Sequence, residues 1–134
     1  ENDVTNLSRF LLNIRRWNIR PEDMIVLMES NPNPLYHPTK QNMINGMRWL
    51  ASGNQAGDSL LFHFSGHGGR QDDKDGDESD GSDETILPCD HARAGVIVDD
   101  ELNSLLVQPL APGVRLTAIF DCCHRYQYLF MYSD

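Results

Sequence analysis

Hydrophobic positions along the chain change between helical spacing and continuous apolar runs. Apolar residues recur every three or four positions from Val4 to Trp17, after a capping residue at Asn2 or Asp3, and this predicts an amphipathic helix. Residues 24–28 are a short apolar run of the kind that forms a buried parallel strand. The chain therefore opens with a helix followed by a strand.

The same alternation continues to residue 120. A second helix is predicted to begin near Thr39, and it leads into an apolar strand over residues 60–64. Residues 86–98 are expected to form two short strands, and residues 114–120 a further strand. The apolar faces of the second helix and of a third helix before residue 114 are Met43, Ile44, Met47, Leu50, Leu102, Leu105 and Leu106. Alternating strands and helices indicate an α/β fold with a mostly parallel sheet flanked by helices.

Two predicted strands end in polar segments that carry a histidine and a cysteine. His67 lies in Ser-Gly-His-Gly-Gly after the strand over 60–64, and Cys123 lies in Asp-Cys-Cys-His after the strand over 114–120. The carboxyl ends of parallel strands are where ligand sites collect. An imidazole can hold a neighbouring thiol as the nucleophilic thiolate, so this pair indicates nucleophilic catalysis.

The spacing of the pair agrees with one known arrangement. His67 precedes Cys123 by 123 − 67 = 56 residues, close to the separation of about 50 residues, histidine first, in caspases. Taken singly, each residue has an ordinary structural interpretation, and we keep that interpretation for Cys89, as core packing in a short strand. It also applies to His63, His91 and His124, because no metal-ligand spacing links them to the cysteines.

The flanking sequences resemble those of metacaspases, which are caspase-like cysteine peptidases. Residues 64–68 and 121–124 look like the two catalytic motifs of that family, and residues 80–90 and 95–102 resemble the stretch between them. The resemblance covers residues 1–124 as a large-subunit-like catalytic domain, and residues 125–134 form a tail without a match. It implies a caspase-like fold without its first strand and without the small-subunit-like part, which is expected as a partner segment of the same protein.

The resemblance also implies an activity and a set of roles. Peptide bonds after Arg or Lys would be cleaved, with Cys123 as nucleophile and His67 as its base. Backbone N–H groups near Gly68 and Cys123 would meet the oxyanion of the tetrahedral intermediate.

The same resemblance implies a substrate pocket for the basic side chain. Asp3, Ser65 and Asp121 would line this pocket, and carboxylates bind a guanidinium through charge-assisted hydrogen bonds.

Residues 72–84 hold eight acids and one lysine, and this segment admits two interpretations. Like charges repel, so a solvated loop is the simpler one. An EF-hand is not indicated, because no register places Gly and Glu where its loop needs them. The metacaspase resemblance implies instead an activating Ca²⁺ bound by Asp83, Asp99 and Asp100. The last two also precede a predicted helix and could cap it.

Composition limits the partners. The net charge of −9 weighs against nucleic acid and favours basic peptides. The sequence contains no run of about 20 apolar residues that would predict a membrane helix. Its three cysteines show no pairing pattern, which favours the cytoplasm.

Two alternatives to a peptidase remain. The first is a catalytically incompetent caspase-like fragment that acts as an interaction or regulatory module, and the last is a plain calcium-binding loop protein.

Overall fold

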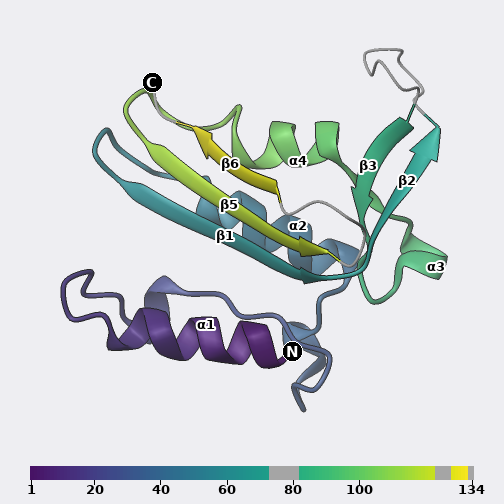
Figure 1. Ribbon diagram of the computed structural model, residues 1–134, viewed down its shortest axis with the longest axis horizontal. Coiled ribbons are helices and arrows are strands. Elements are labelled where there is room, and N and C mark those ends of the chain that lie inside the picture. The colour runs from purple at the N-terminus through teal and green to yellow at the C-terminus, as the bar shows by residue number, and fades with distance from the viewer. Residues whose placement is uncertain (73–81, 123–127, 133–134) are drawn as a thin grey trace.

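Two small β-sheets and four α-helices form the part of the chain that the computed structural model describes, residues 1–72, 82–122 and 128–132 (Figure 1). The helices are α1 (Asn2–Asn13), α2 (Lys40–Leu50), α3 (His91–Ala94) and α4 (Asp99–Leu106). The strands are β1 (Ser59–Gly66), β2 (Gly68–Asp72), β3 (Ser82–Ile86), β4 (Ile97–Val98), β5 (Arg115–Cys122) and β6 (Tyr128–Tyr132). Short 3-10 turns occupy Pro21–Asp23 and Pro34–Tyr36.

The first sheet has the order β1-β5-β6. Strands β1 and β5 are parallel, in a register that runs from Ser59 opposite Arg115 to Gly66 opposite Cys122. β6 joins the other edge of β5 in antiparallel orientation. The α/β class and the parallel pair flanked by helices confirm the predicted fold class.

The second sheet has the order β2-β3-β4 and is antiparallel throughout. Strand β2 follows β1 after the single residue His67, so the glycine-rich segment that the sequence indicates as a break becomes a strand at Gly68. Residues 86–98 do not form two strands as predicted. They contain the end of β3, the one-turn helix α3 and the two-residue β4.

One face of the first sheet packs on α2 and α4. Alternate residues of β1 and β5 point to opposite faces, and the buried ones form a single cluster with the two helices. Its buried members are Met43, Met47, Phe64, Ile86, Ile97, Leu106, Leu116, Ala118 and Phe120. Helix α1 covers the opposite face of the sheet (Figure 1). The sheet is therefore a layer between α1 and the α2–α4 pair.

Helix α2 begins where predicted. Thr39 is its N-cap, and its side chain accepts a hydrogen bond from the backbone N–H of Asn42 at 3.2 Å. At α1 the N-cap is Glu1, and neither Asn2 nor Asp3 caps the helix, since both are within it. The helix ends at Asn13, and Trp17, expected on its apolar face, is 57% exposed beyond that end.

The apolar run over residues 24–28 is extended but is not a strand, contrary to its prediction. No strand in the described part of the chain pairs with it, and Met28 donates its backbone N–H to Tyr36 in the following turn. Ile25 lies over Gly46 of α2 and is 45% exposed. The run therefore packs on α2 through its side chains without the backbone ladder that defines a strand.

Cys89 corrects another expectation. It lies in a turn between β3 and α3 and is exposed, so it does not pack in the core of a strand. Its backbone N–H donates to the carbonyl of Pro38 at 2.9 Å. Within the residues described, no helix is long and apolar enough to cross a bilayer.

Candidate active site

Three polar side chains share the face of the first sheet that α1 covers. In the β1–β5 register Ser65 lies opposite Asp121, and directly paired residues of parallel strands point to the same face. His63 is two residues before Ser65, so it points to this face as well. Asp121 is exposed, while Ser65 and His63 are half-buried. The neighbours Phe62, Phe64 and Phe120 point the other way, into the core.

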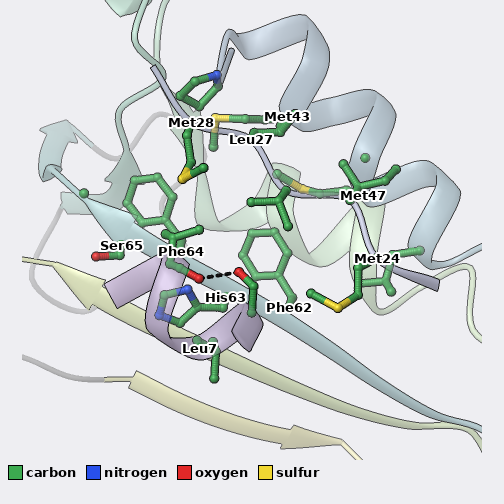
Figure 2. A pocket seen from close by; sticks show the side chains of 18 of the residues that line it. Leu7, Met24, Leu27, Met28, Met43, Met47, Phe62, His63, Phe64 and Ser65 are labelled. Atoms are coloured by element: carbon green, nitrogen blue, oxygen red, sulfur yellow. Dashed lines mark hydrogen bonds between the residues drawn. The ribbon is translucent and has the colours of Figure 1, made fainter. Parts of the chain in front are cut away.

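Helix α1 brings Asp3 to the same face. Figure 2 shows the His63 ring beside Leu7 of α1, and Asp3 lies one turn earlier on that helix. Burial lowers the pKa of the His63 imidazole below its ordinary value, while the carboxylates of Asp121 and Asp3 act in the opposite direction. Both carboxylates are therefore near enough to His63 to act on it electrostatically. The structure thus brings together Asp3, Ser65 and Asp121, the residues that the sequence assigns to a basic pocket.

His67 lies at the end of β1, where the polypeptide passes from the first sheet to the second. The imidazole is exposed, and the backbone carbonyl of His67 accepts a hydrogen bond from the N–H of Leu87 at 3.0 Å. The last pair of the β1–β5 register is Gly66 with Cys122, the residues immediately before His67 and Cys123. Cys123 itself lies outside the described residues.

Gly68 presents its backbone amide away from β3. The bond from the Leu87 N–H to the His67 carbonyl flanks the Gly68–Ile86 pair, which makes this a pair without hydrogen bonds of its own. The amide of Gly68 therefore points to the outer edge of β2, as an oxyanion donor requires. A Cβ on Gly68 would lie 3.2 Å from Cβ of Cys122 and 3.3 Å from the carbonyl of Thr85. Only glycine fits between β3 and the end of β5 without displacement.

Cys89 lines the same cavity as His67 but lacks the properties of a nucleophile. Although Cys89 is exposed overall, partial desolvation raises the pKa of its thiol, and the carboxylates of Glu29 and Asp90 raise it further. The thiolate is the reactive form of cysteine. Cys89 is therefore less reactive at neutral pH than an ordinary free cysteine.

A cavity of about 290 Å³ lies between α1, residues 24–28, α2 and β1 (Figure 2). Most of its wall is apolar, with Leu7 of α1, Leu27 and Met47 among the residues that line it. Ser65, His67 and Cys89 also line it. The polar site is thus continuous with an apolar space that runs beside β1.

The three acids assigned to calcium lie on β3 and at the start of α4. Asp83 is 8% exposed, and Asp99 and Asp100 are the first two residues of α4 rather than its cap, Val98. Asp99 accepts a hydrogen bond from the backbone N–H of Asp100 at 3.0 Å. Within the described residues, no three His, Cys, Asp or Glu side chains are grouped closely enough to hold a metal ion.

Sequence reasoning missed His63 as part of this site. The signal was the period of two along β1, because a residue two positions before Ser65 must share its face. The β2 strand was missed as well, since glycines at 68 and 69 indicate a turn unless the packing beside Cys122 is known.

Comparison with known proteins identifies the family of the chain. The family model described as metacaspase, peptidase C14 domain, matches residues 1–131, which extends past residue 124. The chain is 55% identical to Metacaspase-1B of Aspergillus terreus over 123 residues, which are 92% of this chain and 32% of that protein. It is 51% identical to Metacaspase-1 of Schizosaccharomyces pombe over 92% of this chain and 28% of that protein.

A solved structure adds a neighbour of known fold. The crystal structure of protein GSU0716 from Geobacter sulfurreducens superposes with a TM-score of 0.53 and 36% sequence identity, over 64% of this chain and 31% of that one. The chain spans less than a third of the length of each of these relatives. The match over residues 1–131 and the identity to these relatives show that the chain belongs to the metacaspase family of peptidase C14 domains.

Proposed function

We propose that the chain is the portion of a cysteine endopeptidase that carries both reactive side chains, Cys123 as nucleophile and His67 as general base. The observation that carries this proposal is the β1–β5 register, which ends at the residues before His67 and Cys123, in a chain of the metacaspase family. His67 would take the thiol proton as sulfur attacks the scissile carbonyl, then give it to the leaving amine. Water would hydrolyse the acyl-enzyme.

Gly68 and Cys123 would stabilise the oxyanion through their backbone N–H groups. The outward direction of the Gly68 amide supports this role, since β3 does not occupy that donor. One preorganised donor of this kind contributes a factor of about 10² to 10³ to kcat.

The proposed substrates are polypeptides with Arg or Lys before the scissile bond. Asp3 and Asp121 share a face with Ser65, and a pair of exposed carboxylates at that position would attract a cationic side chain. An Arg guanidinium would neutralise the repulsion between the two acids and donate several hydrogen bonds at once.

Calcium is proposed as an activating ion, with Asp83, Asp99 and Asp100 among its ligands. Carboxylate oxygens suit this hard cation. The three acids come from neighbouring elements, since Asp83 lies on β3, which pairs with β4, and Asp99 and Asp100 begin α4 directly after β4.

The test uses the whole protein in which this chain occurs, a fluorogenic Arg-peptide and a matched Asp-peptide. Cleavage of the Arg-peptide should be lost in Cys123→Ala and retained in Cys89→Ala, which is the matched control. Equal loss in both variants, or preference for the Asp-peptide, would contradict the assignment. Absence of all cleavage from a folded wild-type protein would favour an interaction module.

The calcium proposal needs its own measurement. Millimolar Ca²⁺ should raise the melting temperature, since an ion that binds only the folded state stabilises it. The rise should disappear in Asp99→Asn and persist in Asp58→Asn, an acid immediately before β1. Retention of the rise in Asp99→Asn would remove this site.

A further inference from the structure

His63 is the one histidine of the site that the proposed mechanism does not use. It lies two residues before Ser65 on β1, on the face that also carries Asp121 of β5. Its ring is half-buried beneath α1, next to Leu7 (Figure 2). A titratable ring therefore lies at the base of the pocket that is proposed to receive a basic side chain.

The charged groups around this ring are all acidic. Asp121 from β5 and Asp3 from α1 act on it, and within the described residues no Lys or Arg does so. Glu1 lines the adjoining cavity, but its carboxylate accepts a hydrogen bond from the Ser30 N–H at 2.9 Å. Among the described residues, the carboxylates that act on His63 are thus the two that a substrate cation would need.

We infer that His63 controls the basic pocket by competition: its neutral imidazole leaves Asp3 and Asp121 to a substrate cation, whereas its imidazolium pairs with them and repels that cation. This inference rests on the proposed preference for Arg or Lys. Binding of the cation below the pKa of His63 then requires that one proton leave the ring for solvent. By linkage, a bound cation in turn makes the ring harder to protonate.

Burial of His63 affects the pH range over which its protonation would close the basic pocket. It keeps the pKa of His63 below its ordinary value, despite the two carboxylates. The ring is therefore neutral at pH 7 and above, and the pocket is open to cations there. Acidification through the pKa of His63 would therefore close the pocket.

The test measures binding rather than turnover. Benzamidine is titrated calorimetrically into the whole protein between pH 5 and 8, in two buffers of different ionisation enthalpy, so that proton release is counted directly. In the wild type the affinity should fall about tenfold per pH unit below the pKa of His63, with up to one proton released. His63→Gln should bind with little pH dependence in this range. His91→Gln changes a histidine at the start of α3 whose Nδ1 lies 2.9 Å from the Pro88 carbonyl, and it should keep the wild-type profile.

The outcomes separate the two proposals. Parallel loss of affinity in wild type and His63→Gln overturns the role of His63 and leaves the basic pocket standing. Absence of benzamidine binding at pH 8 in both proteins overturns the basic pocket and the role of His63 with it.

A second measurement does not depend on the ligand. The NMR titration of the His63 ring should move to lower pH in Asp121→Asn and in Asp3→Asn, since each variant removes a carboxylate that favours the imidazolium. An unchanged titration in both variants overturns the competition.

Discussion

Gly68 offers a sharp test of how the two sheets meet at the proposed active site. In Gly68→Ala the new Cβ would lie 3.2 Å from Cβ of Cys122, 3.4 Å from its sulfur and 3.3 Å from the carbonyl of Thr85. Two of these three atoms, Cβ of Cys122 and the carbonyl oxygen of Thr85, are fixed by the backbone and cannot rotate away. Overpacking of this kind costs about 1 to 3 kcal/mol in the free energy of unfolding.

Gly46→Ala is the matched control. At Gly46 of α2 the nearest atom to a new Cβ is Cγ2 of Ile25, at 3.9 Å, which is ordinary van der Waals contact. Alanine favours a helix over glycine by about 1 kcal/mol. The same substitution should therefore destabilise the protein at position 68 and stabilise it at position 46.

Urea unfolding followed by circular dichroism measures both changes. The midpoint should fall in Gly68→Ala and rise in Gly46→Ala, with similar m-values. A double-mutant cycle of Gly68→Ala with Cys122→Gly should recover part of the loss, because Cys122→Gly removes two of the crowded atoms. An unchanged or raised midpoint in Gly68→Ala would show that β2 does not approach β5 this closely.

Four further predictions follow from burial, capping and titration. Met47→Ala, at a side chain 1% exposed, should cost about 2 to 5 kcal/mol in urea unfolding, whereas Leu35→Ala, 75% exposed, should change the midpoint little. Thr39→Ala removes the cap of α2 and should cost about 1 kcal/mol by the same assay. Because the pKa of His63 is lowered in the folded state, the unfolded chain binds more protons, so stability should be lost as pH falls below about 6.5; a loss of the same size in His63→Gln would contradict this. Cys89, whose pKa is raised, should react with iodoacetamide at pH 7 more slowly than a free cysteine does, as mass spectrometry can measure.

The helices and central strands were predictable because their signals are local. The period of β5 places Leu116, Ala118 and Phe120 on one face, and that face is buried. Thr39 is a cap whose hydroxyl can reach the Asn42 amide whatever the rest of the fold does. In both cases neighbours along the chain supply the decisive interaction.

The predictions that were wrong concern segments whose structure depends on residues distant in the sequence. The run over residues 24–28 has the composition of a buried strand, but a strand requires a neighbour with free backbone groups, which composition does not specify. Cys89 looks like a core residue until its turn, anchored to Pro38, places it at the surface.

The site shows the same division between local and distant information. The order of His67 and Cys123 and the alternation along β1 indicate which side chains share a face. The packing of α1 on β1 brings Asp3 near enough to act on His63 electrostatically, and neither segment encodes this packing alone.

Among the described strands, β1 ends the order of its sheet, with β5 on one side and the cavity on the other. Successive amides of a strand point to alternate edges, so every second amide of β1 bonds to β5 and the others face the cavity. Hydrogen exchange along this one strand should therefore alternate between slow and fast residues. A polypeptide segment that filled the cavity as a strand would slow the fast set and leave the slow set unchanged, so the exchange pattern of β1 reports directly on whether that edge is occupied.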